Sequence, residues 1–431
     1  MNYALLHPRD EIALMIARIY KNKMTTSSGG NISILDENGD MWITPAGIDK
    51  GAVTPDDIVL VKQDGSIVGR HKPSSEYPFH RAVYDVRPDL TSVVHAHPIS
   101  LVAFSIAKRV PNTRLFPQTY RWNGKVGFAK YATPGSAELG DKIAERFAAG
   151  FDSVILESHG VCCGGKTLHD AFQRFETLEL CASAEIKASQ LGEPLYLTEE
   201  QLQLESKSAI AFASFEHPVS AMSIEEKDAR NKICAFIARG YSLGLFTGAT
   251  GSVSVRLDAN SFLITPHPLD RFCVAPEEIA LIRSGRCEAG KKPSHAALMH
   301  RAIYEEHPDV GSVINANPVN CLAFSACRRE IDSRTLPECY IHLREVSLLP
   351  FETTFAYPAR AAQALSLRRP AAVLANNGVM VVAANLPNAF NTLEVLDSSA
   401  AAILGSLPIG GFTPMGKDAI DDIIETFNLK K

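Results

Sequence analysis

An internal duplication constrains the fold of this chain more than any other feature. Residues 72–98 read KPSSEYPFHRAVYDVRPDLTSVVHAHP, and residues 292–318 read KPSHAALMHRAIYEEHPDVGSVINANP. At this constant offset of 220 residues, 13 of the 27 positions are identical. Three further pairs of segments correspond in order: SSGGNISI with GATGSVSV, WITPAGID with LITPHPLD, and VILESHGVCCGG with VLANNGVMVVAA. Since 431 residues also exceed what one hydrophobic core usually organises, the repeat predicts two domains of one fold.

The boundary between the two copies is expected near residue 215. The segment 190–223 lies outside the corresponding blocks, and a new helical pattern begins near Ile224. We therefore expect a first domain over residues 1–215 and a second domain over residues 216–431.

Short β-type runs alternate with helical patterns within each copy. In the first copy the strand-like runs, bounded by Gly, Pro and Asp, are NISIL, MWITPAG, IVLVK, SVVHAH and SVILE. The segments SSEYPFHRAVYDVRP and LGDKIAERFAAG are helical in pattern; in the second of them Leu139, Ile143 and Phe147 recur every four residues. This mixture predicts an α/β domain with a central β-sheet layered with helices.

Composition excludes several classes of function. The net charge of −5 carries no basic footprint for nucleic acid, and no apolar run approaches the length of a membrane span. The first residues lack the order of a signal peptide and read as an amphipathic helix. The nine cysteines have irregular spacings, which does not indicate a disulfide framework, and the adjacent Cys162 and Cys163 are expected to be buried structural thiols. We expect a cytoplasmic protein with reduced thiols and with no nucleic-acid or membrane partner.

A His-x-His pair is the strongest local signal of chemistry. In the strand SVVHAH, His95 and His97 project to the same side because side chains alternate along a strand. Two imidazoles held in this way form half of a metal site, although two structural histidines bonded to backbone carbonyls are the alternative. A third histidine, His159, closes the strand SVILESHG, where Gly160 is expected to permit a sharp turn.

A carboxylate completes the candidate set. Glu76 lies 19 residues before His95, in the first turn of the helix that follows Ser74 and Ser75. A lone glutamate at this place is most simply a capping partner or a favourable charge for the helix dipole.

The second copy acts as an internal control for these four residues. The positions of His95, His97, His159 and Glu76 are occupied there by Asn315, Asn317, Asn377 and Ala296. Neighbouring residues are retained, so the four candidates were lost as a set, which indicates one metal site in the first copy alone. Three neutral imidazoles and a carboxylate suit Zn²⁺ best, with another divalent transition metal as the alternative.

Two loops are suited to an anion. Ser27–Asn31 turns the chain before a strand, and its glycines allow backbone N–H groups to point inward. Pro73–Ser75 opens a helix whose first N–H groups are unpaired. Each loop alone is more simply explained as a turn or a helix cap.

The motifs Gly-Asn-x-Ser, Ile-Thr-Pro-x-Gly, Pro-Ser-Ser-Glu, His-x-His and a late His-Gly, in this order, resemble the class II aldolase/adducin family. The resemblance covers nearly all of the first half and, in degenerate form, most of the second. It implies two tandem domains, each a nine-stranded, mostly antiparallel sheet layered with helices. It also implies zinc ligation by His95, His97 and His159 and a catalytic acid/base at Glu76. The phosphate-binding residues implied are Gly30, Asn31, Thr44, Gly47, Ser74 and Ser75.

The family resemblance leaves several activities open. Pentulose-phosphate epimerases of the family typically carry Asp where Glu76 stands, so glutamate favours retro-aldol cleavage of a phosphorylated ketose of the deoxyhexulose phosphate type. A Lewis-acid metal would stabilise an enediolate, and Glu76, made more basic by partial burial, would move the proton. A decarboxylase or dehydratase of a sugar-acid or thio-sugar phosphate is one alternative. A non-catalytic, adducin-like interaction protein is the other.

Two features depart from the family pattern. The aldolases use a tyrosine from the neighbouring subunit, for which the candidates are Tyr120 and, in the second copy, Tyr340. The simple aldolases are also single-domain tetramers, whereas this chain is a tandem. We therefore expect a homodimer whose four domains imitate the tetramer, with residues near Tyr340 beside the zinc of a first domain.

Overall fold

The computed structural model describes residues 3–207 and 212–429 and contains two compact units. The first unit comprises the residues up to 113 together with 118–183, and the second comprises 114–117 together with the residues from 184 onward. The division at 183/184 lies inside one long helix, α6 (Leu168–Leu191). The domain boundary near residue 215 stays a prediction.

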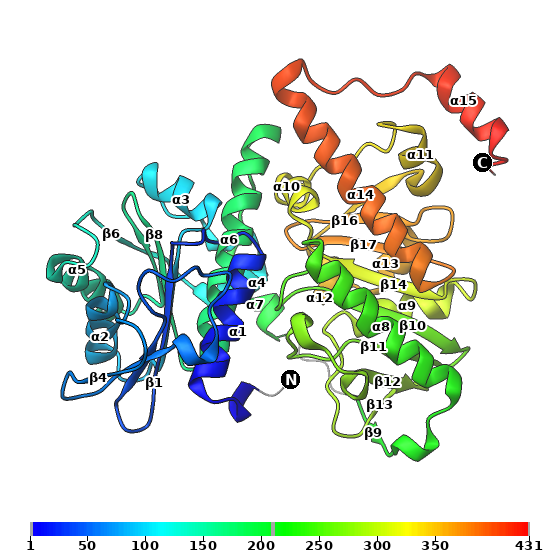
Figure 1. Ribbon diagram of the computed structural model, residues 1–431. Coiled ribbons are helices and arrows are strands. Elements are labelled where there is room, and N and C mark those ends of the chain that lie inside the picture. The colour runs from blue at the N-terminus through cyan, green and yellow to red at the C-terminus, as the bar shows by residue number, and fades with distance from the viewer. Residues whose placement is uncertain (1–2, 208–211, 430–431) are drawn as a thin grey trace. The chain divides into compact units, whose positions relative to one another are not determined.

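An eight-stranded sheet forms the centre of the first unit (Figure 1). Its strand order is β4-β3-β2-β1-β5-β8-β7-β6, and every pair is antiparallel except β6 with β7. The strands are β1 (Asn31–Leu35), β2 (Met41–Ile43), β3 (Val59–Val61), β4 (Ile67–Val68), β5 (Ser92–Ala96), β6 (Gly127–Ala129), β7 (Ser153–Leu156) and β8 (Gly160–Gly165). The strand β5, which carries His95 and is followed directly by His97, is therefore central.

Helices cover both faces of this sheet, with α2 and α5 on one face and α1 and α6 on the other (Figure 1). The remaining helices in this part of the chain, with their bounds, are α1 (Pro8–Lys21), α2 (Tyr77–Val86), α3 (Ile99–Ile106), α4 (Pro117–Asn123) and α5 (Ala137–Ala148). The apolar positions that recur along α2 and α5, such as Phe79, Val83, Ile143 and Phe147, are buried in one core against the sheet. Ser136 caps α5 by accepting a hydrogen bond from the backbone N–H of Leu139.

The second unit repeats this topology. Its sheet has the order β15-β16-β17-β14-β10-β11-β12-β13-β9, so β14 lies between β10 and β17 as β5 lies between β1 and β8. The strands are β9 (Ser214–Phe215), β10 (Ser252–Asp258), β11 (Ser261–Ile264), β12 (Ala280–Arg283), β13 (Arg286–Glu288), β14 (Ser312–Ala316), β15 (Val346–Leu349), β16 (Ala371–Leu374) and β17 (Gly378–Ala383). The short strand β9 is an addition that pairs in parallel with β13. The expected duplication of an α/β fold is confirmed.

Nine helices accompany the second sheet among the described residues. They are α7 (Glu199–Lys207), α8 (Ile224–Ser242), α9 (Ala297–Glu306), α10 (Val319–Cys327), α11 (Pro337–Leu343), α12 (Glu352–Phe355), α13 (Ala359–Ala364), α14 (Leu386–Ser406) and α15 (Lys417–Thr426). In the described part of the chain, one helix is long enough and apolar enough to cross a membrane, judged by length and composition alone. This helix is the segment Leu386–Ile409. Its residues Phe390, Leu393 and Leu396 are buried, and α14 packs on β14 and β17 as a core helix does.

Candidate metal and catalytic site

Three histidines from two segments of the chain converge in the first unit. His95 lies on β5, His97 follows directly after β5, and His159 lies in the turn between β7 and β8. One nitrogen from each ring can be chosen so that all three lie within 4.8 Å of one another. The Nε2 atoms of His95 and His97 are only 3.2 Å apart. The sequence interpretation that these residues act as a set is therefore matched by a geometry that can hold a metal ion.

The donor chemistry of these rings fits a divalent metal. His95 donates from Nδ1 to the carbonyl oxygen of Val161 at 2.9 Å, which leaves the lone pair of Nε2 directed at the other two rings. Burial lowers the pKa of His97 to about 3 and that of His159 to about 4, so both rings are neutral at physiological pH. Neutral imidazole nitrogen is the form that binds zinc and related metals.

Glu76 supplies the carboxylate beside this group. The residue occupies the N-cap position of α2, but its side chain makes no capping hydrogen bond, so the helix-cap interpretation is wrong. Its Oε2 accepts a hydrogen bond from Asn31 Nδ2 at 2.7 Å and lies 3.3 Å from His95 Nε2. Its Oε1 lies 3.4 Å from His159 Nε2, is buried, and has no hydrogen-bond partner.

The pKa of Glu76 is shifted downward, whereas the expectation was a more basic carboxylate with a raised pKa. Burial raises the pKa of Glu76, but its contacts with His95 and His159 and the hydrogen bond from Asn31 lower it. The net effect holds the pKa of Glu76 below its ordinary value. The expectation failed because it considered burial alone and not the polar groups that surround the carboxylate.

A fully buried histidine, His80, holds Asn31 in position. This residue was not among those predicted from the sequence. His80 Nε2 lies 2.5 Å from Asn31 Oδ1, and His80 Nδ1 lies 2.7 Å from Ser33 Oγ. Because the Asn31 amide donates to Glu76, its oxygen must accept, so His80 donates from Nε2 and accepts at Nδ1. Burial lowers the pKa of His80 to about 3, which keeps this neutral tautomer. The signal in the sequence was the retention of this histidine in both copies, as His80 and His300.

Glycines let the surrounding loops approach the histidines. A Cβ atom at Gly29 would lie 2.8 Å from His97 Nδ1, and one at Gly160 would lie 2.7 Å from His97 Cδ2 and 2.5 Å from the carbonyl oxygen of Ala96. The sharp turn expected at Gly160 is instead made by Ser158, whose φ is +54°. Gly160 is needed for space beside β5 and not for its backbone conformation.

The residues expected to bind phosphate lie on loops that pack together. Ser74 N donates to the carbonyl oxygen of Thr44 at 3.1 Å, and Thr44 Oγ1 accepts from the N–H of Ile32 at the start of β1. Asn31 is opposite His95 in the β1–β5 pair, and its amide is already engaged by Glu76 and His80. A role of Gly30, Asn31, Thr44, Gly47, Ser74 and Ser75 in phosphate binding stays a prediction.

Hydrogen bonds replace the candidate metal site in the second unit. Asn315 Oδ1 accepts from His300 Nε2 at 2.6 Å. Asn317 Nδ2 donates to the carbonyl oxygen of Asn377 at 3.1 Å, and Asn377 Nδ2 donates to Thr354 Oγ1 at 3.0 Å. The polar groups at these positions are thus satisfied by the protein itself.

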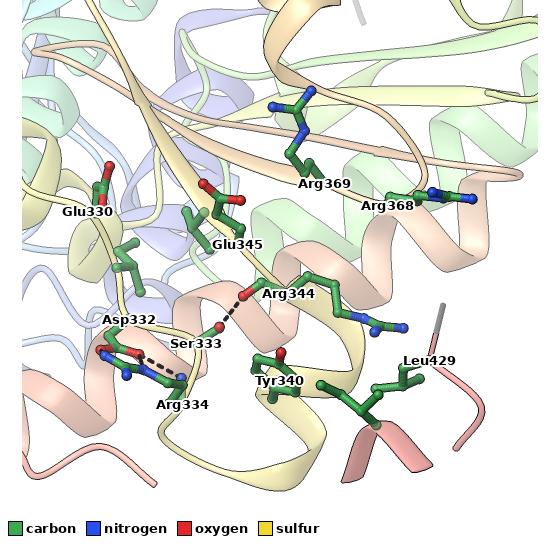
Figure 2. Close-up of a pocket in the computed structure, with 13 residues that line it drawn as sticks. Glu330, Asp332, Ser333, Arg334, Tyr340, Arg344, Glu345, Arg368, Arg369 and Leu429 are labelled. Carbon is green, nitrogen blue, oxygen red and sulfur yellow. Dashed lines mark hydrogen bonds and ion pairs between the residues drawn. The ribbon is translucent and has the colours of Figure 1, made fainter. Parts of the chain in front are cut away.

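The two candidate tyrosines lie in different units of the chain. Tyr120 is half-buried on α4. Tyr340, on α11, lines a cavity of about 790 Å³ together with several charged side chains, including Arg344 (Figure 2). Another arginine of this cavity, Arg334, is engaged by the carboxylate of Asp332. The role of either tyrosine in proton transfer stays a prediction.

Known proteins of similar sequence are sugar-phosphate enzymes. The chain is 30% identical over 209 residues to the 5-deoxy-D-ribulose 1-phosphate aldolase of Bacillus thuringiensis serovar kurstaki, covering 45% of this chain and 92% of that protein. It is 34% identical over 163 residues to the L-fuculose phosphate aldolase of Methanocaldococcus jannaschii, covering 38% and 86%. It is 28% identical over 199 residues to the 3-oxo-tetronate 4-phosphate decarboxylase of Haemophilus influenzae, covering 45% and 93%.

The family model described as the class II aldolase and adducin N-terminal domain matches this sequence twice. The matched segments are residues 10–186 and 231–404, which together span most of the chain and coincide with the two sheets. The chain therefore belongs to the class II aldolase and adducin N-terminal domain family and contains two of its domains.

Proposed function

We propose that the first domain is a metal-dependent aldolase that cleaves a phosphorylated ketose. The observation that carries this proposal is the convergence of three imidazole nitrogens with a carboxylate 3.3 Å from one and 3.4 Å from another. We assign Zn²⁺, because three neutral imidazoles suit zinc, with another divalent transition metal as the alternative. The second domain, in which asparagine replaces all three histidines, is the non-catalytic copy.

Each residue of the site has a separate role in the proposed retro-aldol cleavage. When held by the three histidines, the metal supplies a Lewis acid for vicinal oxygens of the substrate. The bond between the carbon next to the ketone and the hydroxyl-bearing carbon breaks. The hydroxyl proton passes to a base, for which Tyr120 is the candidate, as the aldehyde forms, and the electron pair passes to the carbon next to the ketone. Glu76 in its acid form gives that carbon a proton; it then takes a proton back from solvent, to which the base returns its own. Asn31 occupies Oε2, so Oε1 is the oxygen that carries this proton.

A second candidate function uses the same site. The similarity to a 3-oxo-tetronate 4-phosphate decarboxylase supports loss of CO₂ from a sugar-acid phosphate, after which Glu76 would protonate the same carbon. Dehydration of a thio-sugar phosphate is a further variant of this chemistry. A non-catalytic, adducin-like role fits the second domain, where the ligands are lost, better than the first.

We also propose that the assembly is a homodimer in which each second domain completes the interface that the simple aldolases obtain from a further subunit. The conserved topology of the second sheet supports this proposal, because an interface can be retained after its metal ligands are lost.

A product assay tests the activity. The full chain, loaded with Zn²⁺, is incubated with a panel of ketose 1-phosphates and with a 3-oxo sugar-acid phosphate. The aldolase proposal predicts dihydroxyacetone phosphate and an aldehyde in equal amounts from at least one ketose phosphate. Release of CO₂ without aldehyde would favour the decarboxylase, and absence of any product from metal-loaded protein would favour the interaction protein.

A further inference from the structure

Lys50 is a buried lysine that ties two loops of the first domain together. It lies in the loop after β2, and its side chain and backbone together are 3% exposed. Its backbone N–H donates to the carbonyl oxygen of Ser27 at 2.8 Å, and its Nζ donates to the carbonyl oxygen of Pro45 at 3.0 Å. The backbone of Lys50 is therefore bonded to the loop before β1, and its ammonium group is bonded to the first part of the loop after β2.

The positive charge of Lys50 has no counterion in the described part of the chain. Pro45 is the one hydrogen-bond partner of Nζ among these residues, although an ammonium group offers three donors. Burial lowers the pKa of Lys50, in keeping with a charge taken out of water without an acidic neighbour. An ammonium group in such a place is costly unless an anion binds to it.

The direction of the Pro45 carbonyl locates this charge. The residues on both sides of Pro45 bond to the segment before α2, since Ser74 N donates to Thr44 O and Ala46 N donates to Lys72 O. Carbonyl groups alternate along an extended chain, so the Pro45 carbonyl faces away from that segment, toward the loop that leads into Gly30 and Asn31.

The second domain has a buried cation at the position of Lys50, and there the hydrogen-bond donors of the side chain are satisfied by the protein. Arg271 is the equivalent residue, and its backbone N–H donates to Gly248 as that of Lys50 does to Ser27. Its guanidinium donates to the carbonyl oxygens of Gly248, Gly251 and Leu269. The head group thus reaches Gly251, the counterpart of Gly30, and its donors are taken by the backbone.

We propose that the Lys50 ammonium group binds the phosphate of the substrate in the first domain. This inference rests on the proposed function, in which the substrate is a phosphorylated sugar. The unused Nζ donors supply the positive charge, and the loop of Gly30, toward which the Pro45 carbonyl faces, supplies backbone N–H groups beside the anion. Lys50, with unused donors, differs in this respect from Arg271, whose donors bond to the backbone.

The test compares Lys50→Met, Lys50→Arg and the matched control Lys62→Met, an exposed lysine after β3. Each zinc-loaded full chain is titrated with inorganic phosphate by calorimetry and assayed with a cleaved ketose phosphate and its unphosphorylated counterpart. Lys50→Met should weaken phosphate binding and raise KM for the phosphorylated ketose about tenfold to a hundredfold, the range for a lost charge-assisted hydrogen bond. It should leave turnover of the unphosphorylated ketose near the wild-type rate, and Lys50→Arg should restore part of the loss.

Three outcomes separate the inference from the proposed function. Unchanged phosphate binding in Lys50→Met would overturn the role of Lys50, even if the wild-type protein is an aldolase. Equal losses with both ketoses would also overturn it, because a lysine that only holds the loops affects both substrates alike. Lysine-dependent phosphate binding in a wild-type protein that cleaves no ketose phosphate would support the role of Lys50 and reject the aldolase.

Discussion

Asn31 donates its amide to Glu76 at 2.7 Å while its oxygen accepts from His80 at 2.5 Å. The carboxylate of Glu76 is therefore held by a series of buried hydrogen bonds that begins at His80 in the core. The other oxygen of this carboxylate, Oε1, has no hydrogen bond. In the second domain the corresponding histidine, His300, bonds directly to Asn315, which stands where His95 stands in the first. The same buried histidine bonds to the asparagine that holds Glu76 in one copy, and to the asparagine at the position of His95 in the other.

Replacement of the carboxylate should separate metal binding from catalysis. In Glu76→Ala we expect the metal to be retained and turnover to fall by about 10²–10⁴-fold, the usual contribution of a general acid–base group. The measurement is kcat for the cleaved ketose phosphate together with the metal content of the same sample. A rate near that of the wild-type protein would show that Glu76 takes no part in proton transfer.

Loss of the buried histidine should affect the two domains differently. His80→Phe removes the donor to Asn31, so we expect a lower Tm and a lower kcat with metal still bound, since an unsatisfied buried group costs about 1–3 kcal/mol. The matched variant His300→Phe removes the equivalent bond to Asn315 and should lower Tm while sparing kcat. Equal effects of the two variants on kcat would refute a positioning role for His80.

Acid should destabilise the metal-free protein through the buried imidazoles. Burial lowers the pKa of His97 to about 3 and of His159 to about 4, below the usual value near 6.5. The unfolded chain therefore binds more protons than the folded chain as pH falls from about 6.5 toward 4, and stability is lost over that range. Thermal melting after chelation should show a shallower pH dependence in His97→Asn than in wild type; an unchanged slope would contradict the neutral state of His97.

Truncation tests why the second domain is kept. Residues 1–215 alone should lose most of the activity, and the full chain should have the mass of a homodimer by light scattering. The control is the full chain with the same metal load. A monomeric fragment of 1–215 with full activity would show that the second domain contributes nothing to the site.

The histidine group could be predicted from sequence because of its contrast with the second copy. Strand alternation predicts that His95 and His97 project to the same side, but His159 and Glu76 are distant in sequence and were connected only by their joint replacement. His80 and Lys50 gave no such contrast, since one is retained as His300 and the other is replaced by another cation, Arg271. Their roles depend on burial and on hydrogen-bond partners, which only the three-dimensional structure supplies.

Two other features of the site, the pKa of Glu76 and the turn before His159, could not be predicted from the sequence. The pKa of Glu76 is set by competition between burial and its contacts with His95 and Asn31, so burial alone gave the wrong direction. The turn before His159 uses a left-handed serine, Ser158, at a position where glycine is usual. Such a conformation is imposed by the β7–β8 connection and leaves no mark in the local sequence.

The metal content of the purified full chain tests the central claim most directly. With residues His95, His97 and His159 as the only metal site, elemental analysis after reconstitution should find about one zinc per chain in the wild-type protein. His97→Asn should contain almost none, while its circular dichroism stays native, because the second domain accommodates Asn317 at the same position. Two metals per chain, or one metal that persists in His97→Asn, would contradict the account of one metal domain joined to a degenerate copy.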